Sequence, residues 1–220
     1  MSALIESTWF LDHDSEAVTT FVDEALAAEG IDRSATPRAL ATALFHAVRD
    51  RLRYDPYSMV TDPEDYRAST IAQASSSWCV PKSVLLTAAA RQVGIPARLG
   101  FADVRNHLSS EKLTARMGTD IFYWHGYSEL LLDDRWFKVS SAFNASLCER
   151  LGVGVLEFDG TDDALMHPYD GSGNRYMEYV AQRGSYDDLP LDELLADFRR
   201  LYPSMVGDDA EPDEVFNPSA

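Results

Sequence analysis

The sequence predicts an α+β domain in which an apolar helix packs on an antiparallel sheet. The helix is predicted from an apolar run over residues 84–90, which lies between Pro81 and Gly94. Proline is tolerated in the first turn of a helix, and glycine suits the position after its last turn. The sheet is predicted from two extended runs, residues 121–132 and 136–140, which two adjacent aspartates separate as in a tight hairpin.

Two further helices are expected ahead of the apolar helix. Residues 18–26 place apolar side chains at helical spacing, with Asp14 as their expected cap and Gly30 after them. Thr36-Pro37 then opens a second helix, because proline suits the first helical position. This second helix is expected to end near Arg53, before an irregular stretch rich in Tyr, Pro and Asp.

The chain is expected to leave the apolar helix through Gly94-Ile95-Pro96-Ala97-Arg98 and to continue as a strand over residues 99–104, since the residue before a proline favours extended geometry. The following run over residues 121–132 alternates with a period of two. Strict alternation would place four side chains on one face of that strand, namely Tyr123, His125, Tyr127 and Glu129.

The last third of the chain carries two more predicted elements. Apolar side chains within residues 153–158 predict a short strand that ends at Asp159-Gly160. Asp188-Leu189-Pro190 predicts the start of a helix, and the apolar stripe over residues 191–201 is typical of a helix that packs on its own domain.

The expected organisation is one domain over residues 1–203, with its core at residues 40–145, followed by a flexible acidic tail over residues 204–220. At 220 residues and 45% hydrophobic content, the chain can bury one good core. The tail carries five acidic side chains among Pro, Gly and Ser. Such a composition buries too little apolar surface to order itself.

The charge balance limits the expected partners. Thirty-six acidic against 19 basic side chains give a formal net charge of −17, which opposes binding to nucleic acid or to an anionic membrane. The N-terminus lacks the basic start and long apolar region of a signal peptide, and no apolar run approaches 18 residues. Two cysteines in a chain of this length suggest a reducing, cytoplasmic setting. The expected substrate is a peptide, a protein or a small amide.

Cys79 stands at the predicted start of the apolar helix, directly after Trp78. Unpaired backbone N–H groups and the helix dipole favour a thiolate there, so we expect a lowered pKa and a nucleophilic sulfur near neutral pH. His125, on the strand over residues 121–132, is the expected base. A single cysteine in an apolar setting is more often an inert core residue. The helix start together with the histidine strand nevertheless favours a nucleophile.

Several pieces of the sequence form one recognisable pattern. They are Trp78-Cys79 at the helix start, Leu85-Leu86 to Arg91 along the helix, Gly94-Ile95-Pro96-Ala97-Arg98 after it, and His125, Glu129 and Trp136 along the hairpin. Over residues 40–145 the chain resembles the transglutaminase-like superfamily. The resemblance implies a papain-like fold and a Cys-His-Asp arrangement that catalyses acyl transfer or peptide cleavage.

The sequence departs from that pattern at the third member. The resemblance implies an aspartate a few residues after Trp136, and Ser140 stands in that place. A carboxylate fixes the histidine tautomer and stabilises the charged ring, whereas a hydroxyl orients the ring but stabilises its charge much less. The alternatives for orienting the ring are three polar side chains elsewhere in the chain, Asn144, Asp159 and Asp103.

The sequence therefore predicts a cysteine hydrolase or acyltransferase in which Cys79 attacks a carbonyl, His125 moves the proton and Ser140 orients the ring. The Cys79 N–H is the expected first oxyanion donor, and Gln73 and Trp78 are the candidates for the second. The alternative is a binding or scaffold protein that keeps the fold but has lost turnover. This alternative is motivated by Ser140, because loss of the carboxylate can cost a triad enzyme about ten-thousandfold in rate.

The remaining cysteine and histidines have no expected chemistry. Cys148 is expected to be inert, and the histidines expected to be ordinary are His13, His46, His107 and His167. A zinc site needs three or four convergent ligands, and the sequence has neither a C-x-x-C nor an H-x-x-x-H spacing. The glycine pairs at residues 152–154 and 171–173 lack the lysine or the strand-to-helix context of a phosphate loop. We therefore expect neither a metal nor a cofactor.

Overall fold

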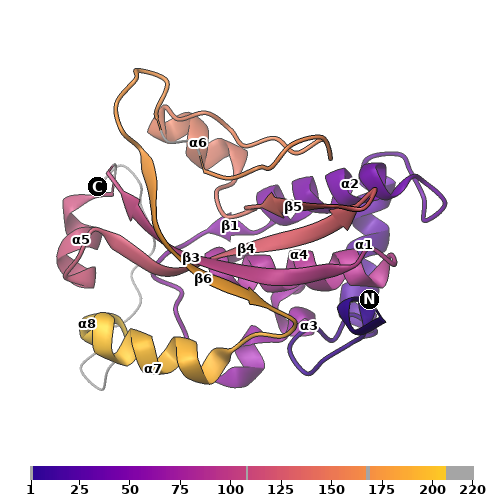
Figure 1. The fold of residues 1–220 in the computed structure, drawn as a ribbon, viewed down its shortest axis with the longest axis horizontal. Coiled ribbons are helices and arrows are strands. Elements are labelled where there is room, and N and C mark those ends of the chain that lie inside the picture. Colours follow the sequence, from indigo (N-terminus) through magenta and orange to yellow (C-terminus); the bar gives the residue numbers. More distant parts are fainter. Residues whose placement is uncertain (1, 108, 167–168, 207–220) are drawn as a thin grey trace.

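A four-stranded antiparallel sheet with the strand order β5-β4-β3-β6 forms the centre of the fold (Figure 1). The computed structural model describes residues 2–107, 109–166 and 169–206. The strands of this sheet are β3 (Ala97–Asn106), β4 (Ile121–Leu132), β5 (Arg135–Val139) and β6 (Met177–Tyr186). A separate parallel pair joins β1 (Arg53–Tyr54) to β2 (Ser76–Ser77). The mixture of helices with an antiparallel sheet confirms the predicted α+β class.

The helices surround the sheet on one face and at its ends. In chain order they are η1 (Ser2–Ile5), α1 (Glu16–Ala28), α2 (Pro37–Arg51), η2 (Pro63–Tyr66), α3 (Ala68–Ile71), α4 (Cys79–Gln92), α5 (Glu111–Met117), α6 (Ala145–Leu151), α7 (Leu191–Leu201) and α8 (Pro203–Val206). Figure 1 shows α1, α2 and α4 behind the sheet and α7 and α8 along its lower side.

The starts of the first two long helices are set by hydroxyl caps. The Thr36 hydroxyl accepts a hydrogen bond from the backbone of α2, which begins at the predicted Pro37. The cap of α1 is Ser15, whose hydroxyl accepts from the Val18 N–H, and not the expected Asp14. Asp14 accepts a hydrogen bond from the Ser7 hydroxyl instead.

The predicted hairpin is formed by β4 and β5. β4 covers the predicted residues 121–132, and β5 covers residues 135–139. Asp133 and Asp134 form the two-residue turn, with φ angles of 49° and 62°. Two left-handed residues match the twist of paired strands, and short acidic side chains tolerate that conformation better than most.

α4 is the central helix, and all of its residues except Gln92 are buried. The buried Lys82 ammonium donates to the carbonyls of Arg49 and Leu52 at 2.9 and 2.7 Å. Near the other end of α4, the Arg91 guanidinium donates to three backbone carbonyls. Buried cations are tolerated when such acceptors satisfy them. Lys82 thereby ties the first turn of α4 to the end of α2.

α4 approaches β4 closely because residue 126 is glycine. A Cβ atom at Gly126 would lie 2.7 Å from the Ser83 Oγ and 3.0 Å from the Val80 Cα, both in the first turns of α4. Nearby, the Ser128 hydroxyl donates to the Ser83 carbonyl, and the Thr87 hydroxyl donates to Ser128. Close backbone approach is a common reason for a glycine inside a strand. It sets the distance between the helix and the strand here.

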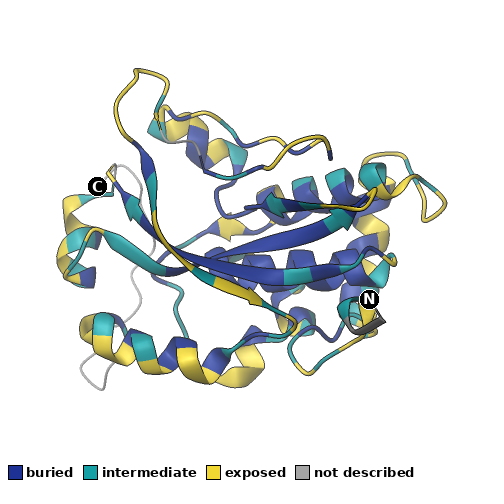
Figure 2. Cartoon of the chain, viewed as in Figure 1, coloured by how far each residue is buried: buried dark blue, intermediate teal, exposed yellow. Residues whose placement is uncertain are grey.

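The Tyr127 side chain on β4 reaches across β3 to β6. Gly100 on β3 is the partner of Tyr127 on β4, and a Cβ atom at Gly100 would overlap the Tyr127 ring. The ring therefore crosses β3, and its hydroxyl donates to the Gln182 side chain on β6 at 3.0 Å. β6 is the outermost strand and is largely exposed, whereas β3, β4 and α4 are buried (Figure 2).

A bulge interrupts β4 between Phe122 and His125. Ala102 pairs with His125 and Val104 pairs with Phe122, so two residues of β4 lie opposite one residue of β3. Trp124 has a φ angle of 58°, which is unusual for a large side chain. The strict alternation predicted from Tyr123 to Glu129 is therefore broken at this point.

The segment over residues 153–158 is not the strand that the sequence predicts. It is irregular, although Val153, Leu156 and Phe158 are buried. The Leu156 carbonyl accepts a hydrogen bond from the Arg49 guanidinium at 2.6 Å, and the Phe158 ring packs edge-on against Phe45. The alternating apolar side chains are thus buried against α2, and an arginine satisfies a backbone group that a neighbouring strand would otherwise satisfy.

Several elements of the structure were not predicted from the sequence, and β6, α5 and α6 are the longest of them. β6 lies at the edge of the sheet, and Met177 is its one buried residue. An edge strand that buries few side chains has little apolar pattern to recognise. The helices α5 and α6 have seven residues each, which is too short for a clear helical period.

The C-terminal helix α7 begins at the predicted Leu191 and packs on its own domain. The Tyr202 hydroxyl, just after α7, donates to the Ile121 carbonyl at 2.8 Å and accepts from the Tyr123 N–H at 2.5 Å. α8 extends over residues 203–206, so the first part of the expected tail is helical here, and Met205 is buried. The rest of that tail, residues 207–220, lies outside the described residues.

Candidate active site

Cys79 is the first residue of α4 and follows directly after β2 and Trp78. Parallel pairing of β2 with β1 fixes the chain just before the helix. Trp78 takes the N-cap position in an extended conformation, and its side chain makes no capping hydrogen bond. The first N–H groups of α4 therefore have no side-chain acceptor from the cap, at the end of the helix where the dipole favours negative charge.

His125 is brought to the start of α4 by the unequal lengths of β4 and β5. β5 ends at Val139, which pairs with Ser128, so the preceding part of β4 has an edge free of β5. Gly126 lies in this part, and a Cβ atom there would be 3.0 Å from the Val80 Cα and 3.2 Å from the Cys79 carbonyl oxygen. Because His125 is the residue before Gly126, the strand holds the histidine beside the cysteine.

Ser140, which directly follows β5, lies against the His125 ring. The Ser140 Oγ is 3.3 Å from the His125 Nε2, and both side chains are buried. The Ser140 N–H donates to the Ala164 carbonyl at 2.8 Å, which fixes the backbone at this position. A hydroxyl can either donate or accept, so the contact fits both neutral tautomers of the ring. A carboxylate would only accept and would select one tautomer.

Burial controls the protonation of Cys79 and His125, each of which is only 5% exposed. Burial raises the pKa of Cys79 to about 11, although the N–H groups of Gly126 and Val80 and the charge of Lys82 act in the opposite direction. Burial also lowers the pKa of His125 to about 4. The expectation of a lowered cysteine pKa is therefore wrong for this structure, because desolvation outweighs the effect of the helix start.

The thiol and the imidazole are both neutral at pH 7 with these pKa values. Among residues 2–107, 109–166 and 169–206, no hydrogen bond joins Cys79 to His125. The two groups are therefore neighbours that lack a preformed thiolate and imidazolium ion pair.

Asn144, one alternative to Ser140, is used elsewhere. Its carboxamide oxygen accepts from the Tyr54 N–H at 3.0 Å, and its nitrogen donates to the Ser146 hydroxyl at 2.8 Å. These bonds join β1 to the start of α6. Asn144 therefore stabilises the fold around the site and does not contact the His125 ring.

The two aspartates predicted as alternatives to Ser140 also bind other partners. Asp103 accepts from the Trp124 N–H at the bulge and pairs with Arg183 on β6. Asp159 is exposed and accepts from the backbone N–H and the hydroxyl of Thr161. Of the side chains predicted to orient His125, Ser140 is therefore the one whose hydroxyl contacts the ring.

The two predicted oxyanion donors differ in position. Gln73 is exposed, and its amide donates to the Ser69 carbonyl at 3.0 Å, so it takes no part in this site. The indole nitrogen of Trp78 is buried and has no hydrogen-bond partner within the described residues. The Ser141 hydroxyl, beside Ser140, is another buried group without a partner among the described residues, and no sequence pattern predicted it.

Two residues that support the site were missed from the sequence. Lys82 lies one turn after Cys79, and burial lowers its pKa to about 7. Gly126 permits the close packing of α4 on β4. A lysine inside an apolar helix and a glycine inside an aromatic strand were the available signals, since each is unfavourable unless tertiary structure requires it.

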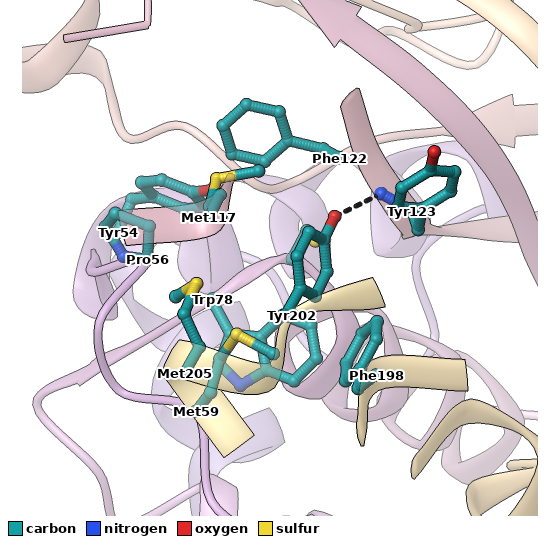
Figure 3. A pocket seen from close by; sticks show the side chains of 11 residues that line it. Tyr54, Pro56, Met59, Trp78, Met117, Phe122, Tyr123, Phe198, Tyr202 and Met205 are labelled. Carbon is teal, nitrogen blue, oxygen red and sulfur yellow. Dashed lines mark hydrogen bonds between the residues drawn. The ribbon is translucent and has the colours of Figure 1, made fainter. Parts of the chain in front are cut away.

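A small cavity, partly open to solvent, lies beside Cys79 (Figure 3). We call it the Cys79 chamber. Its lining residues are Tyr54, Pro56, Met59, Trp78, Cys79, Met117, Phe122, Tyr123, Phe198, Tyr202 and Met205. Figure 3 shows Tyr202 between Trp78 and β4, with its hydroxyl bonded to the Tyr123 backbone. The chamber therefore joins the start of α4 to α5, β4 and the C-terminal helices.

The other cysteine and histidines lie in different surroundings. Cys148 is buried in α6, and burial raises its pKa to about 11. His13 contacts a backbone carbonyl, and His46 and His107 contact carboxylates. His167 lies outside the described residues.

Within the described ranges, no group of three or more His, Cys, Asp and Glu side chains could hold a metal ion. No helix in these ranges is long and apolar enough to cross a membrane.

Comparison with protein families agrees with this architecture. The model of the transglutaminase-like superfamily matches residues 24–141, which is more than half of the chain. The chain belongs to this superfamily. The matched region contains Cys79, His125 and Ser140. Members of the superfamily commonly have cysteine-based acyl transfer or protease activity.

Two solved structures also resemble this chain. One is a candidate cysteine protease from Cytophaga hutchinsonii, with 14% sequence identity and a TM-score of 0.44 over 63% of this chain and 40% of the other. The second is a TGase, with 15% identity and a TM-score of 0.40 over 94% of this chain and 53% of the other. The chain thus spans about half of these proteins or less. A search of curated proteins found no match.

Proposed function

We propose that this protein is a cysteine-dependent hydrolase or acyltransferase that acts on a peptide or carboxamide carbonyl. The observation that carries the proposal is the meeting of Cys79, at the start of α4, with the His125–Gly126 segment of β4, where Ser140 contacts the ring. A nucleophile, its base and a polar group on the base are the parts that acyl transfer requires. Membership of a superfamily with this chemistry supports the same assignment.

The geometry assigns a different task to each nitrogen of the ring. The Nε2 atom faces Ser140, so Nδ1 is the atom left to receive the proton of Cys79. This requires the tautomer in which Nε2–H donates to the Ser140 hydroxyl and Nδ1 carries a lone pair. Ser140 thus acts as a positioning residue, because its hydroxyl orients the ring and accepts from Nε2–H in the competent tautomer.

In the proposed reaction, the sulfur attacks the carbonyl carbon while its proton passes to His125. The C–S bond forms, the carbonyl π electrons move to oxygen, and the backbone N–H of Cys79 donates to that oxygen. When the tetrahedral species collapses, the C–N bond breaks and His125 returns the proton to the departing amine. The product of this half-reaction is a thioester on Cys79. Water then gives a carboxylic acid, and an amine gives a new amide.

The neutral resting state determines the order of these steps. Because Cys79 has a pKa of about 11 and His125 a pKa of about 4, a separated ion pair is unfavourable before substrate arrives. Proton transfer is therefore expected to accompany attack on the carbonyl. The sulfur does not need to carry a full charge at any stage of such a step.

A second candidate function is a binding or scaffold protein that keeps the superfamily fold without turnover. It is favoured by the neutral pair, by the lack of a Cys79–His125 hydrogen bond among the described residues, and by Ser140 in place of a carboxylate. The two candidates differ in one property that can be measured without knowing the substrate. Only the enzyme needs a Cys79 whose reactivity depends on His125.

The test is acylation and alkylation of the folded protein between about pH 5 and pH 9. The reagents are 4-nitrophenyl acetate and iodoacetamide, and mass spectrometry of the peptides that contain Cys79 and Cys148 reports each thiol. The proposed enzyme predicts faster modification of Cys79 than of Cys148 by both reagents. Equal and slow modification of both thiols would favour the scaffold function instead.

A further inference from the structure

We propose that the Cys79 chamber is the acyl-side pocket of this protein and selects a neutral, apolar side chain, aromatic or branched, next to the carbonyl that Cys79 attacks. This inference rests on the proposed function and deepens it, because it names the class of substrate. It is carried by the composition of the chamber, by the position of Cys79 in its wall, and by the state of the polar atoms around it.

Cys79 is itself one of the residues that line the chamber. A group that enters the cavity therefore lies next to the reactive sulfur. The neighbouring wall is formed by Trp78 and Phe198, whose rings are 5.6 Å apart, and by Tyr202 (Figure 3). Aromatic walls of this kind favour apolar and aromatic groups through both buried area and ring geometry.

None of the described residues that line the chamber carries a charge, although the protein as a whole has a formal net charge of −17. Transfer of an ionised group from water into such surroundings is strongly unfavourable unless a partner compensates it. The acidic surface and the neutral chamber therefore act on different substrate groups. An acidic or basic side chain cannot be accommodated next to Cys79 without an unpaired charge.

Uncharged polar side chains are also disfavoured. The Tyr202 hydroxyl already bonds to the Ile121 carbonyl and to the Tyr123 N–H of β4 (Figure 3). It has one hydrogen to donate, and that hydrogen is used. The Trp78 indole N–H has no partner among the described residues and can donate to a carboxamide oxygen, but it cannot satisfy the two amide N–H groups of that carboxamide. A buried amide N–H without an acceptor is unfavourable. The chamber thus distinguishes a phenylalanine or leucine side chain from a glutamine side chain.

Three methionines give the chamber an adaptable shape. Met59 precedes η2, Met117 ends α5 and Met205 lies on α8, so the three side chains come from separate elements. Methionine is unbranched and polarizable, and it adapts to irregular apolar groups. The space between the lining side chains is small, so an entering side chain has to displace the methionines, and flexible methionines permit this for a set of related apolar groups.

The C-terminal wall of the chamber lies outside the part of the chain that the family model matches. Phe198, Tyr202 and Met205 come from α7 to α8, whereas the match ends at residue 141. Selectivity for the acyl side chain is therefore assigned to a segment added to the shared core. Met205 is the most direct residue to change, because it is buried at the end of that wall.

The experiment uses four acetyl-capped amino acid acyloxymethyl ketones that carry Phe, Leu, Gln or Glu side chains, together with iodoacetamide. In each ketone the Cys79 sulfur bonds to the methylene carbon, the bond from that carbon to the carboxylate leaving group breaks, and the thiol proton passes to His125. The second-order rate of Cys79 modification is divided by the iodoacetamide rate. The Phe and Leu probes should react about tenfold faster than the Gln probe and about a hundredfold faster than the Glu probe.

Met205→Gln tests the assigned wall, and Ser204→Gln is the matched control on the exposed side of α8. Met205→Gln should reduce the ratio of Phe to Gln probe rates about threefold or more, because it places a hydrogen-bonding partner in the chamber. Ser204→Gln should leave the ratio unchanged. If Met205→Gln does not fold, the rates of the four probes with the wild-type protein still test the proposed pocket.

The outcomes separate the inference from the function on which it rests. Equal rates for the four ketones, or a Gln or Glu probe that reacts fastest, would overturn the apolar pocket while iodoacetamide still labels Cys79. No reaction of Cys79 with any reagent would remove the proposed function and the pocket together. A preference for Phe and Leu that Met205→Gln weakens and Ser204→Gln does not would support the inference.

Discussion

Cys79 and Cys148 are both buried in helices, and burial raises the pKa of each thiol to about 11. Both also lie within reach of the charge of Lys82. Their neighbours differ. Cys79 begins α4, lines a cavity and contacts the strand that carries His125, whereas Cys148 lies inside α6. A thiol's acidity therefore does not distinguish the two sites here, and the difference lies in access and in a nearby proton acceptor.

The largest expected effect comes from removing that acceptor. His125→Gln should slow acylation of Cys79 by 4-nitrophenyl acetate about 10²–10⁴-fold, which is the range typical of a positioned general base. Among the described residues, no histidine forms a hydrogen bond with Cys148, so the modification rate of Cys148 should not change. The measurement is nitrophenolate release combined with mass spectrometry of the two cysteine peptides. An unchanged Cys79 rate would show that the strand does not supply the base.

The buried His125 should also make the fold sensitive to acid. Its pKa is about 4 in the folded protein against an ordinary value of 6.5, so the unfolded chain binds more protons between these values. Stability linked to this group is complete above about pH 6.5 and is lost as the pH falls towards 4, by about 3 kcal/mol in total.

Urea unfolding at pH 7 and pH 4 measures this loss. His125→Gln should remove about that amount of the pH dependence, and the half-buried His46→Gln serves as the control. Identical pH dependence in wild type and His125→Gln would contradict the lowered pKa, because it would mean that His125 has the same pKa in the folded and unfolded protein.

The packing of α4 on β4 gives the next effect. Gly126→Ala should destabilise the protein by about 1–3 kcal/mol, since a Cβ atom there meets Ser83 and Val80, and it should slow acylation of Cys79 by moving the helix start. Gly171→Ala is the control, because its nearest neighbour lies 3.5 Å from the added Cβ. Thermal unfolding and nitrophenolate release report the two effects. Equal stability of the two variants would contradict the close packing.

The smallest effects are expected at Ser140. Ser140→Ala should slow acylation of Cys79 about two- to tenfold, which corresponds to one neutral hydrogen bond. Ser140→Asp should raise the pKa of His125 and fix the competent tautomer, so Cys79 should react at least as fast as in the wild type. Asn144→Ala should reduce stability through loss of the Tyr54 contact, with a smaller effect on acylation. A loss of acylation confined to Asn144→Ala would reject Ser140 as the positioning residue.

The sequence predicted the parts of the fold that depend on local signals. Pro81 and Gly94 marked α4, and the alternating run with its two aspartates marked the hairpin of β4 and β5, with bounds that agree closely with the structure. Turn and cap residues act on the backbone within a few positions, so their effect can be predicted without knowledge of distant contacts. The segment at residues 153–158 was misinterpreted because alternate burial against a helix leaves the same pattern as a strand.

The properties of the site depended on contacts between distant segments, which the sequence alone could not predict. The raised pKa of Cys79 results from burial by the surrounding elements, and this outweighs the local effect of the helix start. The chamber combines residues from 54 to 205. The contact of Ser140 with His125 agrees with the place of the expected aspartate, whereas Gln73 proved to be exposed.

Residues 121–127 of β4 are not paired with β5, so this part of the strand has an open edge. An unpaired strand edge is a template on which another chain can add by backbone pairing, and natural proteins usually blunt or cover such edges. Here the Tyr202 hydroxyl bonds to the Tyr123 N–H and the Ile121 carbonyl, and the start of α4 packs closely against Gly126. Two helical segments thus lie where the neighbouring strand is missing. The same contacts that shape the reactive centre protect this edge from aggregation.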